Sequence, residues 1–161
     1  MKQLSFEQFS QHLAPEDMGG GSVFGALSIE ATHFLLERGV LYELASGDTL
    51  FEPGDRGDCF YVVCKGSLDF FKMYKGALRH IREVGFGEET GFVPMIALHK
   101  QTGVAMARED SIVVEIGADL YAEFQQAHTL DFGLLTLNLA REMARVIDRM
   151  GESLIDQTIV R

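Results

Sequence analysis

The fold follows from residues 45–68, which read ASGDTLFEPGDRGDCFYVVCKGSL. Glycines and aspartates separate short apolar runs throughout this stretch. Gly54, Gly57 and Gly66 can adopt the positive φ that sharp corners between strands require. Asp55 and Asp58 can bond to neighbouring backbone amides in the same turns. We interpret these five residues as builders of the fold and not as ligand contacts.

The same pattern of short apolar runs separated by turn residues extends from Val40 to about Ile116. Closely spaced apolar runs with Gly/Asp turns predict an antiparallel double-stranded β-helix, a jelly-roll-like β-roll that is mainly β with flanking α. Residues 85–98 interrupt this pattern and predict a glycine-containing loop that enters a short helical turn. The expected strands are 40–44, 49–51, 59–64, 67–74, 78–84, 103–106 and 111–116.

Helical patterns flank the predicted roll. A short helix is expected over 4–13, followed by a flexible turn or linker at Gly19–Ser22. A second helix is expected from an N-cap at Ser28 to Gly39. After a short helix at 120–126, a long one is expected from Thr129 to Met150, with Gly151 as its stop. These patterns divide the chain into 1–22 (helix and linker), 23–128 (roll) and 129–161 (lid or dimerisation helix and tail).

The long helix carries apolar residues on two sides, so two surfaces are needed to cover it. One is the roll, and the other is the same helix of a second subunit, which predicts a homodimer. The alternative is a monomer whose helix folds wholly onto the roll. The first stripe, close to a heptad seam, is Phe132, Leu135, Leu139, Met143, Val146 and Met150; the second is Leu134, Leu137, Ala140, Ala144 and Ile147.

Composition narrows the functional class. The formal net charge is −10, with 24 acidic and 14 basic residues, which opposes binding to nucleic-acid phosphates. The N-terminus lacks the apolar core of a signal peptide, and no run approaches the roughly 18 apolar residues of a membrane span. Cys59 and Cys64 fall on opposite faces of one expected strand and are predicted to be reduced thiols of a cytoplasmic protein.

The stretch 45–68 resembles the cyclic nucleotide-binding domain family, which includes catabolite activator protein, kinase regulatory subunits and gated channels. The resemblance spans roughly residues 23–150. Phe86-Gly87-Glu88 matches the family's phosphate-binding cassette. The resemblance implies that amides at a helix start cradle an anion and that Glu88 accepts from a ribose 2′-hydroxyl. The implied ligand is cAMP or cGMP, and no other cofactor or metal is expected.

The cassette departs from the family at its arginine. That position falls on Gln101, with Thr102 after it, and a one-residue shift places Lys100 there instead. Glu89 adds a negative charge beside the site. Loss of a charge-assisted bond worth ~1.5–3 kcal/mol weakens phosphate binding. The candidate ligand contacts are Gly87, Glu88, Glu89, Thr90, Lys100, Gln101 and Thr102, with Met150 and Ser153 from the helix that lids the pocket.

These observations predict a non-catalytic regulatory module that binds a cyclic nucleotide or another small anionic ligand and signals through its long helix to an unknown effector protein. The alternative is a roll without ligand that acts in dimerisation or partner docking. Amides near position 88 decide between them: an electropositive hollow favours a sensor, and a plugged hollow with carboxylates turned inward favours a scaffold. Arg141, Arg145 and Arg149 either replace the missing arginine or form a solvated face. No enzyme motif appears, the five histidines are scattered, and residues 152–161 are too few for a helix-turn-helix.

Overall fold

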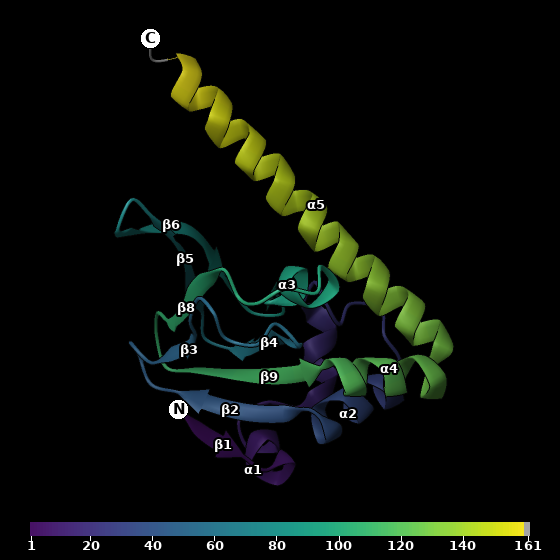
Figure 1. The fold of residues 1–161 in the computed structure, drawn as a ribbon. Helices are drawn as coiled ribbons and strands as arrows, with labels where there is room; N and C mark the ends of the chain where they lie inside the picture. The colour runs from purple at the N-terminus through teal and green to yellow at the C-terminus, as the bar shows by residue number, and fades with distance from the viewer. Residues whose placement is uncertain (160–161) are drawn as a thin grey trace.

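Two antiparallel sheets form a β-roll, with helices packed at one end and a long helix that leaves it diagonally (Figure 1). The computed structural model describes residues 1–159, and the side chains of residues 1–155. The predicted fold class is confirmed. One sheet has the order β1 (Lys2–Leu4), β2 (Val40–Leu44), β9 (Ser111–Gly117), β4 (Cys59–Lys65), β7 (Glu89–Thr90); the other has the order β3 (Thr49–Phe51), β8 (Gly103–Ala107), β5 (Leu68–Tyr74), β6 (Ala77–Val84).

Strand β4 is buried on both faces, which explains its nearly unbroken run of apolar residues. Phe60 and Val62 face a core shared with the helices, whereas Tyr61 and Val63 face the core between the two sheets. The two cysteines follow the same alternation, with Cys64 in the first core and Cys59 in the second. This division between two cores confirms the expected placement on opposite faces. Both thiols are free and buried.

Helices cover the outer face of the larger sheet. Helix α2 begins as predicted, because the Ser28 side chain accepts from the Ala31 N–H at 3.2 Å, and Gly39 caps its end. No helix in the described part of the chain is long and apolar enough to cross a membrane. The helices are α1 (Phe6–Ser10), η1 (Pro15–Gly20, a 3₁₀ helix), α2 (Ile29–Arg38), α3 (Phe92–Ile96), α4 (Ala118–Ala127) and α5 (Thr129–Ile159).

Four local expectations differ from the structure. Residues 85–98, expected as a loop that enters a helical turn, include the short strand β7, which pairs with β4. The single helix expected over 4–13 is instead strand β1, which pairs with β2, followed by the short α1 that a capping box at Ser5 begins. The expected glycine-rich linker includes the end of η1, which buries Met18 against the core. Helix α5 continues past Gly151 to Ile159. A glycine inside a helix costs only about 1 kcal/mol relative to alanine, so it does not terminate the helix by itself.

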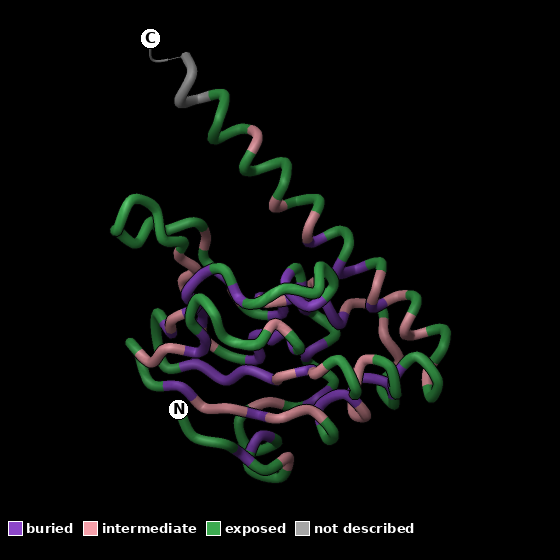
Figure 2. Tube along the Cα trace, in the orientation of Figure 1, coloured by how far each residue is buried: buried purple, intermediate pink, exposed green. Residues whose placement is uncertain are grey.

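Helix α5 is buried against the roll at points along its first half, and its residues 144–155 are mostly exposed (Figure 2). Leu135 and Leu139 of the first apolar stripe are fully buried, while Leu137 and Ile147 of the second stripe are exposed. The Asn138 side chain donates to the backbone carbonyls of Val23 and Gly25, at 3.1 and 2.7 Å. The two-sided pattern therefore gives one covered face and one open face.

Candidate functional site

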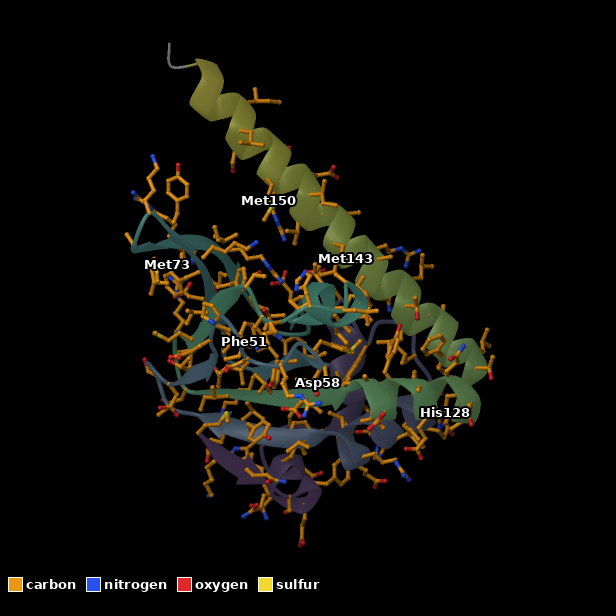
Figure 3. All side chains as sticks on the ribbon, in the orientation of Figure 1. Phe51, Asp58, Met73, His128, Met143 and Met150 are labelled. Carbon is orange, nitrogen blue, oxygen red and sulfur yellow. The ribbon has the colours of Figure 1, made fainter. Side chains whose placement is uncertain are left out.

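A cavity of about 390 Å³ lies between the β5–β6 hairpin, the β7–α3 segment and helix α5. Figure 3 labels Met143 and Met150 on the stretch of α5 that closes this side of the roll. The volume of the cavity falls in the range of small-molecule sites. The lining residues are Phe70, Lys72, Ile81, Arg82, Glu89, Thr90, Gly91, Val93, Pro94, Gln101, Thr102, Met143, Val146, Ile147 and Met150.

Arg82 brings a guanidinium group into this cavity from strand β6. The pairing of β5 with β6 shifts register, because Phe70 faces Arg82 while Phe71 faces His80, which leaves Ile81 as an extra residue. Such a bulge re-aims the neighbouring side chains. Arg82 Nη2 donates to the backbone carbonyl of Glu89 at 2.5 Å. Its Nη1 is buried and has no hydrogen-bond partner among the described residues.

Glu89 places a buried carboxyl group beside Arg82. Its Oε2 accepts from the Phe92 N–H at 3.0 Å, and its Oε1 lies 3.9 Å from Arg82 Nη2. Burial raises the pKa of Glu89 to about 7, although Arg82 and the Phe92 N–H both oppose the rise. Glu142 and Glu88 push the pKa of Glu89 further upward through charge repulsion. The carboxyl group is therefore poised to change charge near neutral pH.

The expected cradle of free amides near Glu88 does not form, because these amides already donate within the protein. The Gly87 N–H bonds to the Val63 carbonyl at 2.8 Å, and the Glu88 N–H bonds to the Gly85 carbonyl at 3.0 Å. Glu88 also turns its carboxylate to the Gly85 N–H, at 2.8 Å, and is not among the lining residues. The positively charged residues that line the cavity are Arg82 and Lys72 of the β5–β6 hairpin, and the guanidinium of Arg82 is the one that bonds to the β7 backbone.

The predicted site residues divide into two groups. Glu89, Thr90, Gln101, Thr102 and Met150 line the cavity together, although the first four come from two separate segments of chain. Gly87, Glu88 and Lys100 do not line it. Ser153 lines an adjoining hollow of about 560 Å³, which shares Ile81, Arg82, Val146 and Met150 with the cavity.

The arginine stripe of α5 does not supply the guanidinium in the cavity. Arg141 donates to the Asn138 side chain at 3.3 Å, and Arg145 pairs with Glu142 at 3.7 Å. Arg149 lines only the adjoining hollow. The hairpin residues that do line the cavity went unpredicted, because a register shift leaves no mark in an alternating sequence. These are Phe70, Lys72, Ile81 and Arg82.

Comparison with known proteins gives one consistent result. The model of the cyclic nucleotide-binding domain family matches residues 41–128. A cAMP-dependent protein kinase regulatory subunit from Debaryomyces hansenii is 26% identical over 94 residues, which are 58% of this chain and 20% of that protein. The chain thus corresponds to a fifth of the length of this curated relative.

Solved structures share the fold at low sequence identity. A cyclic nucleotide-binding domain from Methylobacillus flagellatus gives a TM-score of 0.80 at 16% identity, over 97% of this chain and 88% of that one. The catabolite activator protein of Thermus thermophilus gives a TM-score of 0.70 at 23% identity, over 87% and 63% of the two chains. The first of these likenesses includes nearly the whole chain, α5 with it.

Proposed function

This chain belongs to the cyclic nucleotide-binding domain family, and on that premise we propose that it binds a cyclic nucleotide or a similar small anionic ligand in the cavity beneath α5. The module is regulatory and non-catalytic. Ligand binding changes the position of α5 against the roll, and an effector protein recognises that change.

The observation that carries the proposal is the unpaired Nη1 of Arg82. A buried donor without an acceptor is costly, and a charged one more so. An anionic oxygen in the cavity supplies the missing acceptor. The guanidinium is also held in place in advance by its bond to the Glu89 carbonyl, which lowers the entropy lost on binding.

Helix α5 supplies one wall of the cavity through Met143, Val146, Ile147 and Met150, while the roll supplies the other walls. A ligand that touches both walls favours one position of the helix over others, since it binds that position more tightly. The exposed apolar residues of α5 then meet the same helix of a second copy. This gives a route from ligand to subunit contact.

Two features favour the alternative of a scaffold without ligand, and the first is that the amides of Gly87 and Glu88 already donate within the protein. The second is that Glu89 turns its carboxyl group to the first amide of α3 and thereby satisfies a donor that an anion would otherwise use. In that alternative the polar groups of the cavity serve only to hold α3 and β6 together.

Calorimetric titration with cAMP and cGMP, with 5′-AMP as comparator, tests the proposal. Arg82→Gln removes the charge but keeps donors, and its matched control is Arg79→Gln, an exposed arginine of the same strand that does not line the cavity. Loss of a charge-assisted bond predicts affinity at least about tenfold weaker for the first variant and unchanged for the second. Binding that survives Arg82→Gln intact, or absent binding at millimolar nucleotide, contradicts the proposal and favours the scaffold.

A further inference from the structure

Three buried side-chain polar atoms lack a hydrogen-bond partner among residues 1–155, and they lie close to one site. They are Nη1 of Arg82, Nε2 of Gln101 and Oε1 of Glu142. Buried polar groups are nearly always paired, so such a cluster needs a reason. The first two are donors of residues that line the cavity. Within the cavity the missing component is therefore an acceptor, whereas the third atom, Oε1 of Glu142, is itself an acceptor and belongs to a residue that does not line the cavity.

Gln101 is held in position by its own backbone. Its N–H donates to the Asp55 carbonyl and its carbonyl accepts from the Gly54 N–H, both at 2.9 Å. The residue is 4% exposed. Its amide nitrogen lies against Gly91, so that a β-carbon added to this glycine would stand 3.3 Å from it. The amide is thus fixed beside the start of α3, where its free N–H has no solvent to meet.

Glu89 is the third polar group of the cavity. Its Oε2 is engaged by the Phe92 N–H, while its Oε1 lies 3.9 Å from Arg82 Nη2, beyond direct hydrogen-bond distance. Burial raises the pKa of Glu89 to about 7, so that the acid form is well populated near neutral pH. In that form the carboxyl group gains a hydrogen-bond donor.

The charges around Glu89 come from every side of the site. Arg82 of β6 opposes its protonation, and Lys72 of β5 also lines the cavity. Glu88 and Glu142 favour its protonation. Glu142 is not a lining residue and acts through charge, with Arg145 as its ion-pair partner. A bound anion adds one more negative charge and shifts the balance further toward the acid form.

We infer that the cavity receives an oxyanion through three donors, namely Arg82, Gln101 and the acid form of Glu89, and that binding takes up a proton. This rests on the proposed function, because it concerns the same cavity. A carboxylate that accepts from a ligand hydroxyl must stay ionised. Glu89 as a donor in its acid form and Glu89 as an ionised acceptor therefore predict opposite effects of pH on affinity.

Titrations at about pH 6.5, 7.5 and 8.5 separate the two roles. Calorimetry measures the binding of cAMP and cGMP, and NMR measures the binding of sulfate. The charges of cAMP and of sulfate do not change in this range. With one linked proton, affinity falls by up to about tenfold for each pH unit above 7. The binding enthalpy also changes with the ionisation enthalpy of the buffer. Glu89→Gln, which keeps a donor in the place of the acid form, removes the pH dependence, while Gln101→Leu weakens binding about tenfold at every pH.

The outcomes distinguish this inference from the proposal on which it rests. Affinity that rises with pH, or that does not change with pH in the unaltered protein, overturns the three-donor site and leaves ligand binding standing. Equal affinity in Gln101→Leu also overturns it. Absence of binding by all three probes overturns both.

Discussion

Gly21 and Gly87 pack backbone against backbone, because a β-carbon on Gly21 would stand 2.5 Å from the Gly87 α-carbon and one on Gly87 would stand 2.2 Å from the Gly21 α-carbon. Two hydrogen bonds also join these segments. The Val23 N–H donates to the Gly87 carbonyl at 3.0 Å, and the Ser22 hydroxyl donates to the same carbonyl at 3.2 Å. The N-terminal segment thereby supports the chain that leads into β7 and the cavity.

This contact predicts that Gly87→Ala lowers the free energy of unfolding by roughly 3 kcal/mol or more. The variant suffers strain at a φ of +73° and also a backbone collision. Gly47→Ala is the control, since Gly47 has a φ of +89° but open space around it, and strain alone costs about 1–2 kcal/mol. Urea unfolding measures both. Equal losses in the two variants would mean that the Gly21 contact contributes nothing.

Glu89→Gln is expected to make the protein more stable in alkaline solution. The pKa of Glu89 is raised to about 7 in the folded protein, above its ordinary value, so the folded chain holds this proton more tightly than the unfolded chain. The resulting stability is full below the ordinary pKa and is lost as pH rises through about 7. With 1.36 kcal/mol per pH unit, the loss reaches about 3 kcal/mol by pH 8.

The glutamine variant escapes this loss, so its melting temperature exceeds that of the unaltered protein at about pH 8 and approaches it at about pH 5. Glu52→Gln is the control, because it removes a carboxylate that is exposed. Lower stability of Glu89→Gln at pH 8 would show that the ionised form is the one the fold favours.

Both cysteines are expected to be inert toward thiol reagents in the folded protein. Burial raises the pKa of Cys59 to about 11, and it raises the pKa of the fully buried Cys64 further. The thiolate is the reactive species, so labelling waits for the protein to open. Ellman's reagent at about pH 8 should report almost no free thiol before urea is added and two per chain afterwards. Rapid labelling without urea would contradict the burial of β4.

Substitution of the open face of α5 is expected to separate a dimer into single chains. Leu137→Glu combined with Ile155→Glu places charge on two exposed apolar positions outside the cavity. Light scattering should give the mass of two chains for the unaltered protein and of one for the variant. Gln126→Glu on α4 is the control. A single-chain mass for the unaltered protein would reject the second copy as the partner of this face.

The strands could be read from the sequence because their turns are chemically explicit. The strands expected at 40–44 and 49–51 coincide with β2 and β3, and the other five expected strands each differ by one residue at one end. Gly and Asp mark these corners through backbone conformation, which is a local property. The ends of the chain were harder, because β1 forms only through pairing with β2, a distant segment.

The cavity could be predicted only in part, for a related reason. Gln101 and Thr102 were found because they stand where the family carries its arginine. Arg82 was missed, since its inward direction depends on the register shift between β5 and β6. Glu89 was noted for its charge, but its pKa depends on burial by segments remote in sequence. Such properties arise from packing and have no local signature.

The bonds from Asn138 to Val23 and Gly25 hold α5 at a pivot near its first third. Beyond this pivot the rod passes the cavity and continues for roughly 25 Å to Ile155, at 1.5 Å per residue. Because α5 is held near one end, a small rotation produces a larger displacement at the other end. A tilt of about 5° moves the far end by about 2 Å over this length. A modest rearrangement around Met143 is thereby magnified at the tip.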